Sequence, residues 1–169
     1  MTVISIHKLD KTSTQDNASE QVLAQLAQIE SKLFVHDAWS AAQINSLLAQ
    51  SFNHIIYATD ELNQRLVGYC FYSHIFEDAE ILKIATCLDY QKQGIASQLL
   101  TAMVQMCQTT GAERVLLEVR EDNHDALAFY QKHGFEQIAV RKNYYDNHDT
   151  TKTHALIMQR KLNAKLNAK

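Results

Sequence analysis

The sequence predicts an α/β protein that forms one domain. Apolar residues alternate along the chain between extended runs, which are typical of strands, and helical spacing. The change is clearest after residues 81–85, where an apolar run gives way to Leu99 and Met103 on one helical face. A length of 169 residues is typical of a single domain with a sizeable core. Residues 1–162 are therefore expected to form the domain, and residues 163–169 a short frayed tail.

The first half of the chain predicts a strand, two helices and three further strands. Strands are expected at residues 3–6, 54–59, 65–75 and 80–87, and the first helix over residues 22–34. Ser40 is a suitable N-cap for the second helix, and the polar turn at residues 60–64 predicts an antiparallel hairpin. Trp39 lies in the loop between the helices. Packing is the usual role of such a side chain, and contact with a substrate is the alternative.

The second half predicts a helix, a strand, a helix and two strands. The helices are expected over residues 95–109 and after the N-cap Asn123, and the strands at residues 114–120, 135–141 and 154–160. Gly111 and Gly134 follow the two helices as C-terminal stops. Tyr144 and Tyr145 are expected in a polar loop before the last strand.

Two polar side chains occupy positions that suggest chemistry. Alternation along residues 114–120 places Glu118 near the carboxyl end of an otherwise apolar strand. Buried acids are rare unless they are paired or functional, so Glu118 is either an active-site carboxylate or the partner of Arg120 or another base. Tyr130 falls on the inward stripe of its helix, where core packing is the usual explanation.

The loop before residue 95 has the features of a phosphate-binding loop. Residues 91–96 have the pattern Q-x-x-G-x-A and lead directly into a helix. A helix start directs unpaired backbone N–H groups and the positive end of its dipole into the loop, and Gly94 lets a ligand approach the backbone closely. The P-loop and dinucleotide-binding patterns are absent. An ordinary strand-to-helix connection remains the alternative on these residues alone.

Composition and charge exclude several classes of function. A formal net charge of −3 gives no electrostatic footprint for nucleic acid. No apolar run approaches the roughly 20 residues needed to cross a bilayer, so a cytoplasmic protein without a membrane partner is expected. The three cysteines are far apart, which indicates buried, reduced thiols. The eight histidines show no metal-ligand spacing, so no metal is expected.

Several motifs resemble those of one enzyme superfamily. The pattern at residues 91–96 resembles the acetyl-CoA loop of the GCN5-related N-acetyltransferases, and N-x-x-A-x-x-x-Y-x-x-x-G-F at residues 123–135 resembles a second landmark of that family. The resemblance implies a mixed sheet of six or seven strands with helices on both faces. Within the superfamily, LEVR (117–120), FYQKHGF (129–135) and RKNYY (141–145) resemble the RimI-type ribosomal-protein-alanine N-acetyltransferases.

This resemblance implies a mechanism and a set of site residues. A free amine would attack acetyl-CoA directly, with Glu118 as general base and Tyr130 as general acid. A backbone N–H of residues 84–86 would polarise the acetyl carbonyl. Acetyl-CoA would contact Ile84, Ala85, Thr86, Gln91, Lys92, Gln93, Gly94, Ile95, Ala96, Ser97 and Asn123. Trp39, Tyr144 and Tyr145 would form the walls of a peptide slot.

The implied acceptor is the N-terminal segment of a ribosomal protein, and the implied enzyme is a monomer or weak dimer. An α-amine has a pKa of about 7.7 to 8.0 and a lysine about 10.4, so freeing the lysine amine costs roughly 3.5 kcal/mol more at neutral pH. Two alternatives stay open: an acetyltransferase of polyamines, amino sugars or antibiotics, and a non-catalytic acyl-CoA sensor. Thr153 and His154 depart from the usual Glu-Asp of this branch, which leaves the exact acceptor open.

Overall fold

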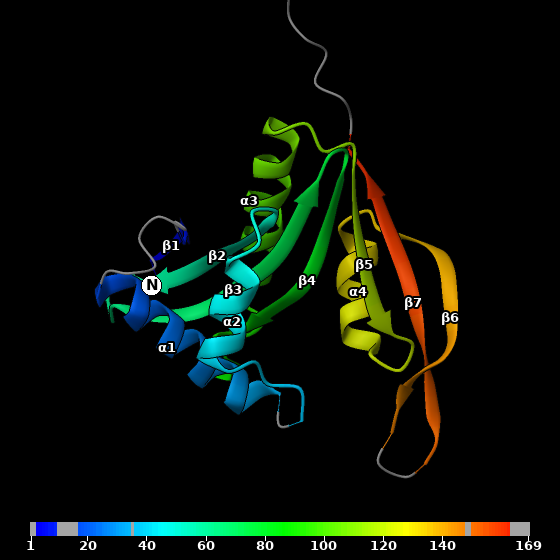
Figure 1. Cartoon of the computed structure of the whole chain (residues 1–169), viewed down its shortest axis with the longest axis horizontal. Helices are drawn as coiled ribbons and strands as arrows, with labels where there is room; N and C mark the ends of the chain where they lie inside the picture. Colours follow the sequence, from blue (N-terminus) through cyan, green and yellow to red (C-terminus); the bar gives the residue numbers. More distant parts are fainter. Residues whose placement is uncertain (1–2, 10–16, 35, 148–149, 163–169) are drawn as a thin grey trace, which may run out of the picture. The chain divides into compact units, whose positions relative to one another are not determined.

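The computed structural model describes residues 3–9, 17–34, 36–147 and 150–162 of the chain. Its elements are β1 (Ile4–Lys8), α1 (Asn17–Leu33), α2 (Ala41–Leu48), β2 (Asn53–Asp60), β3 (Arg65–Ile75), β4 (Asp78–Thr86), a 3-10 turn (Leu88–Tyr90), α3 (Ile95–Thr109), β5 (Arg114–Arg120), α4 (His124–Lys132), β6 (Glu136–Asp146) and β7 (Lys152–Lys161), drawn in Figure 1. The expected tail at residues 163–169 lies outside the described residues.

The strands form a mixed sheet of seven strands, as predicted. Hydrogen bonding orders them β1-β2-β3-β4-β5-β7-β6. Strands β4 and β5 are parallel, whereas β1 with β2, β2 with β3, β5 with β7 and β6 with β7 are antiparallel. The chain divides into two compact units, residues 1–73 with 83–106 and residues 74–82 with 107–169. Each unit is therefore described by itself.

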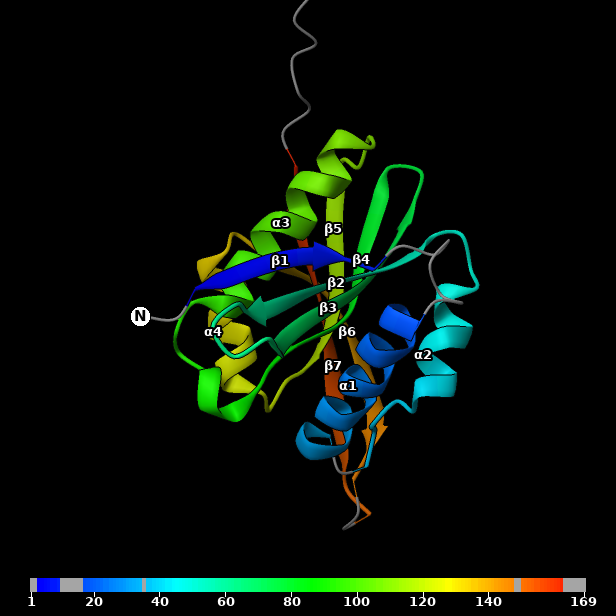
Figure 2. The same cartoon turned by 90° about the vertical axis from the view of Figure 1, so that its left-hand side faces the viewer.

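The first unit carries helices on both faces of β3. Tyr69 donates a hydrogen bond to Glu30 of α1, so its side chain points toward that helix. A Cβ on the neighbouring Gly68 would lie 3.2 Å from Ile95 and 3.3 Å from Leu99, both on α3. Because successive residues of a strand face opposite sides, α1 and α3 pack on opposite faces of β3. Helices α1 and α2 lie side by side in both views (Figures 1 and 2).

In the first unit the Ser40 cap and the bounds of α3 are confirmed, whereas α1 begins at Asn17, before the predicted residue 22. Ser40 caps α2 through a capping box with Gln43, which satisfies two backbone donors at once. Helix α3 spans the predicted residues, and its face contributes fully buried Leu99, Leu100 and Met103. Strand β4 begins at Asp78, two residues earlier than predicted, because Asp78 and Ala79 already pair with β5.

The second unit consists of β5, α4 and the β6–β7 hairpin together with the start of β4. Val115, Leu117 and Val119 are buried, whereas Glu118 and its neighbours on the other face are partly exposed, as alternation predicts. Asn123 caps α4, and Gly134 has the positive φ of +81° that ends it. The expected loop around residues 144–145 is wrong: both tyrosines belong to β6, which continues through a bulge at Asn143 (φ +56°).

The close approach of β3 to β4 and α3 at Gly68 makes a stability prediction. A Cβ there would lie 2.9 Å from the backbone oxygen of Ala85, which is closer than packed carbon and oxygen atoms approach. We expect Gly68→Ala to lower the free energy of unfolding by about 1–3 kcal/mol through overpacking. Urea denaturation would measure the change, and an unaltered midpoint would contradict this account of the packing.

Candidate active site

The loop between β4 and α3 has the backbone geometry of an anion-binding helix start. Its exposed residues turn through positive φ angles at Lys92 (+59°) and Gly94 (+82°). The first intrahelical bond of α3 runs from Gln98 N to Gly94 O at 3.0 Å. The N–H groups of Ile95, Ala96 and Ser97 therefore precede the helical bonding pattern and are directed out of the helix end.

Gly94 leaves space in front of that helix start. A Cβ built on Gly94 would meet no atom within 4 Å, so the backbone there borders open space. The positive φ also disfavours any residue with a side chain. The predicted start of α3 at Ile95, directly after this glycine, is confirmed.

The end of β4 offers an unsatisfied polar group beside this loop. The Thr86 hydroxyl is buried and has no hydrogen-bond partner among the described residues. The Thr86 carbonyl accepts a 3.3 Å hydrogen bond from the Gln91 side chain, which ties the loop to the strand end. Buried polar atoms are normally paired, so an orphaned hydroxyl at this point suits a polar ligand.

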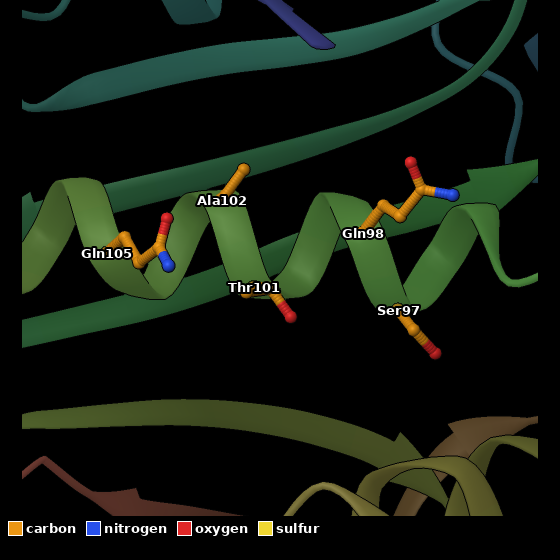
Figure 3. A pocket seen from close by; sticks show the side chains of 5 residues that line it. All are labelled: Ser97, Gln98, Thr101, Ala102 and Gln105. Atoms are coloured by element: carbon orange, nitrogen blue, oxygen red, sulfur yellow. The ribbon is translucent and has the colours of Figure 1, made fainter. Parts of the chain in front are cut away.

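A shallow groove follows the outer surface of α3 away from the loop. Figure 3 shows the five side chains that line it, with Ser97 and Thr101 pointing to the same side: Ser97, Gln98, Thr101, Ala102 and Gln105. All are uncharged, and Ser97, Thr101 and Ala102 are small. The groove starts at Ser97, one of the residues expected to contact acetyl-CoA, and continues for two turns of the helix.

The backbone N–H of Trp39 binds a buried carboxylate, that of Glu30, which the sequence did not predict. Glu30 is 0% exposed, and its carboxylate accepts hydrogen bonds from the Tyr69 hydroxyl, from Lys83 Nζ at 2.9 Å and from the Trp39 backbone N–H at 2.9 Å. Burial, followed by the hydrogen bond to Glu30, raises the pKa of Tyr69 far above its usual value, so Tyr69 remains a hydrogen-bond donor. The Trp39 ring stacks on Phe71 at 5.1 Å.

The Lys83 ammonium lies close to two aromatic rings, those of Phe34 and Trp39. Its Nζ is 4.4 Å from the Phe34 ring centre and 4.3 Å from the Trp39 ring centre, and it also donates to the Asp37 carbonyl at 2.9 Å. Packing therefore accounts for the Trp39 side chain. The sequence does contain a signal for the Glu30–Lys83 pair, because each residue is a charge within an apolar segment. Glu30 lies on the core-facing side of α1, and Lys83 lies inside β4.

Glu118 is paired in the second unit, with a different partner from the one considered first. The alternative of a pairing base is met by Arg141 rather than by Arg120, whose side chain bonds to Asp122, Asn147 and Thr153. The Glu118 carboxylate lies 2.6 Å from Arg141 of β6, and its side chain is 22% exposed rather than buried. It borders a second carboxylate: partial desolvation and then Glu118 raise the pKa of Glu80, whereas Arg141 lowers it.

The structure groups the predicted substrate tyrosines with Glu118. The Arg141 guanidinium lies 5.4 Å from the Tyr144 ring centre, and the Arg120 guanidinium lies 5.0 Å from that of Tyr145. The two tyrosine rings meet edge to face at 5.0 Å, and Tyr144 is 50% exposed. Glu118 and both tyrosines thus belong to one connected polar cluster of the second unit.

The remaining predicted residues of the second unit lie on α4. Tyr130 is 7% exposed, and its ring packs edge to face on Phe129 and Phe135. The Asn123 side-chain oxygen accepts the N–H of Ala126 at 3.2 Å, so that oxygen serves as the helix cap. Glu118 of β5 and Tyr130 of α4, the expected base and acid, therefore lie on different elements of the second unit.

The described residues show two further properties that bear on function. No group of three or more His, Cys, Asp or Glu side chains among them is placed to hold a metal ion. In the same part of the chain, the helices are too short or too polar to span a membrane. Cys70, Cys87 and Cys107 are buried, as predicted.

Comparisons with known proteins identify the class of the chain. The acetyltransferase (GNAT) family model matches residues 22–135. The putative ribosomal protein bS18-alanine N-acetyltransferase of Bacillus subtilis is 33% identical over 118 residues, which is 70% of this chain and 77% of that protein. The N-alpha-acetyltransferase RimI of Mycobacterium tuberculosis is 35% identical over 124 residues, covering 70% of this chain and 75% of that protein.

A solved structure shows the same architecture over nearly the whole chain. The ribosomal-protein-S18-alanine N-acetyltransferase of Escherichia coli has a TM-score of 0.79 at 25% identity, with 94% of both chains covered. A Haemophilus ducreyi enzyme of the same name is 34% identical over 93 residues, and the match spans 64% of its length, less than two thirds.

The seven-stranded sheet, the loop before α3 and these matches define the class as an N-acetyltransferase. The chain belongs to the acetyltransferase (GNAT) family. Within that family its similarity is to the RimI-type enzymes, as the motifs predicted.

The Glu30–Lys83 pair makes a prediction about stability. Lys83 is 15% exposed and Glu30 is 0% exposed, so Lys83→Met leaves a buried carboxylate without its counter-charge. We expect a loss of about 3 kcal/mol of unfolding free energy, and a smaller loss in the Glu30→Gln/Lys83→Met double variant. Urea denaturation of the two variants would measure both changes.

A matched control comes from an exposed ion pair. Arg114 and Asp78 form a bidentate bridge with side chains 44% and 37% exposed. Arg114→Gln should cost less than about 1 kcal/mol. Equal losses at the buried and exposed pairs would contradict the burial argument.

Proposed function

We propose that this enzyme transfers the acetyl group of acetyl-CoA to the α-amine of a protein N-terminus, with the N-terminal alanine of a small-subunit ribosomal protein as the first candidate acceptor. The observation that carries the proposal is the cluster in which Arg141 links Glu118 to Tyr144. A carboxylate base beside exposed aromatic rings suits an amine at the end of an extended peptide. The names of the Bacillus subtilis and Mycobacterium tuberculosis relatives support the same acceptor class.

Glu118 is the proposed general base. Its carboxylate is partly exposed, so an acceptor amine or an intervening water can reach it from solvent. The pKa of an α-amine is roughly 2.5 units below that of a lysine amine. A single carboxylate can therefore deprotonate an N-terminus more readily than a lysine at neutral pH.

Tyr130 is the proposed general acid. Its ring is held by Phe129 and Phe135, and a hydroxyl on such a fixed ring can donate a proton to the departing thiolate with little loss of side-chain freedom. Peptide acceptors would pack on Tyr144 and Tyr145.

The residues around the start of α3 fit the cofactor. Acetyl-CoA supplies an activated thioester and a pyrophosphate. The N–H groups of Ile95, Ala96 and Ser97 would bind the pyrophosphate, with Lys92 adding a positive charge. The open space at Gly94 and the unpaired Thr86 hydroxyl support this placement. The other proposed contacts are Ile84, Ala85, Gln91, Gln93 and Asn123.

An acceptor panel tests the proposed substrate. The purified enzyme would receive labelled acetyl-CoA with an Ala-starting basic peptide, the same peptide blocked at its N-terminus but carrying a lysine, and spermidine. We expect label on the first peptide at a kcat/KM at least about tenfold above the other two. Turnover confined to spermidine would overturn the acceptor class, and absence of turnover with every amine would favour an acyl-CoA sensor.

Substitution of the proposed base and acid tests the mechanism. Glu118→Gln and Tyr130→Phe should each lower kcat by about 10²–10⁴, because each removes one proton transfer. Both changes leave the residues of the proposed pyrophosphate loop at 91–97 unaltered, so calorimetry should give an acetyl-CoA Kd close to that of the wild type. Wild-type rates in both variants would refute these roles.

A further inference from the structure

Arg141 reaches Glu118 from two strands away. On β7, Ala155 pairs with Arg141 of β6 on one side and with Arg120 of β5 on the other, and Glu118 pairs with Ile157. Neighbouring strands are about 4.8 Å apart, so the Arg141 side chain must cross β7 to reach β5. The residue beneath its path is Ala155, which is fully buried and has the smallest chiral side chain.

The charges around Glu118 leave Arg141 as its cation. The charged groups near it are Glu80 of β4 and Arg141 of β6, together with Arg120, which alternation along β5 places on the same face. Arg120 is engaged by Asp122 at 2.8 Å. The Arg141 guanidinium is therefore the nearby cation for both Glu118 and Glu80. Its side chain is 50% exposed, so it can move away from Glu118 while β6 stays folded.

The same guanidinium stands where an acceptor amine is needed. It lies 2.6 Å from the proposed base and 5.4 Å from the ring of the proposed peptide wall, Tyr144. At neutral pH an α-ammonium group carries the same single positive charge as the guanidinium. Exchanging one for the other keeps the charge balance at Glu118 and Glu80.

We propose that Arg141 is a built-in placeholder for the acceptor ammonium: it occupies the Glu118 carboxylate in the acceptor-free enzyme and is displaced by the incoming N-terminus. This inference rests on the proposed function. Arg141 is thus a positioning and specificity residue that competes with the acceptor, and the competition lowers the apparent affinity of every amine that binds there. A neutral N-terminus gains nothing from displacing it.

Peptide binding without acetyl-CoA tests the exchange. Calorimetry would compare an Ala-starting peptide with its N-acetylated form on the wild type, Arg141→Gln, Arg141→Lys and Lys142→Gln. We expect Arg141→Gln to tighten the free-amine peptide roughly two- to fivefold, the range of an exposed ion pair, and to leave the acetylated peptide unchanged. Arg141→Lys keeps the cation and should stay close to the wild type.

Lys142→Gln is the matched control, because it removes the same charge from the adjacent exposed residue of β6. It should change neither affinity. The gain in Arg141→Gln should be larger at pH 6.5 than at pH 9, where the α-amine is mostly neutral. Weaker or unchanged binding of the free-amine peptide to Arg141→Gln, or equal tightening of both peptides, would overturn the placeholder role.

Steady-state kinetics separates this inference from the proposed function. In Arg141→Gln the KM for the peptide should fall while kcat stays within about threefold of the wild type. A wild-type enzyme that acetylates spermidine and no peptide would refute the proposed acceptor. The displacement of Arg141 could still be tested in that case, by measuring the KM for spermidine in the same four proteins. An unchanged spermidine KM in Arg141→Gln would overturn the exchange as well.

Discussion

The buried Glu30 carboxylate is the constraint on which the first unit depends. A charge without exposure to water must be surrounded by donors, and Glu30 receives them from Tyr69, Lys83 and the Trp39 backbone. These donors come from β3, β4 and the loop between α1 and α2. The chain can satisfy the carboxylate only when all three segments are in place, so the position of α1, the path of the loop and the register of β4 are determined together.

This constraint extends to the residues proposed to bind the cofactor. Lys83 directly precedes Ile84 in β4, and its ammonium is fixed by Glu30, by the Asp37 carbonyl and by two aromatic rings. On the other face of β3, Gly68 lies against Ala85 and the first turns of α3. The end of β4 and the start of α3 are therefore held from both faces of the sheet, which suits a loop whose backbone N–H groups must be preorganised for a ligand.

The sequence predicted what local chemistry determines. Ser40, Asn123 and Gly94 act through neighbours within three or four residues, and the strand and helix periods follow from spacing alone. Contacts set by strand order were not predictable: Glu118 and Arg141 are 23 positions apart and meet only because β7 lies between β5 and β6. For the tyrosines of β6 the sequence predicts a loop, because a bulge at polar residues has the composition of a turn.

The surroundings of Trp39 have a practical consequence. It is the single tryptophan of the chain. Its indole stacks on Phe71, lies 4.3 Å from the Lys83 ammonium and follows a backbone N–H bound to Glu30. Tryptophan fluorescence of the unmodified protein therefore comes from one indole, and the polarity and charge around that indole depend on the loop between α1 and α2. The emission of that indole is a label-free optical reporter of this loop, already built into the chain.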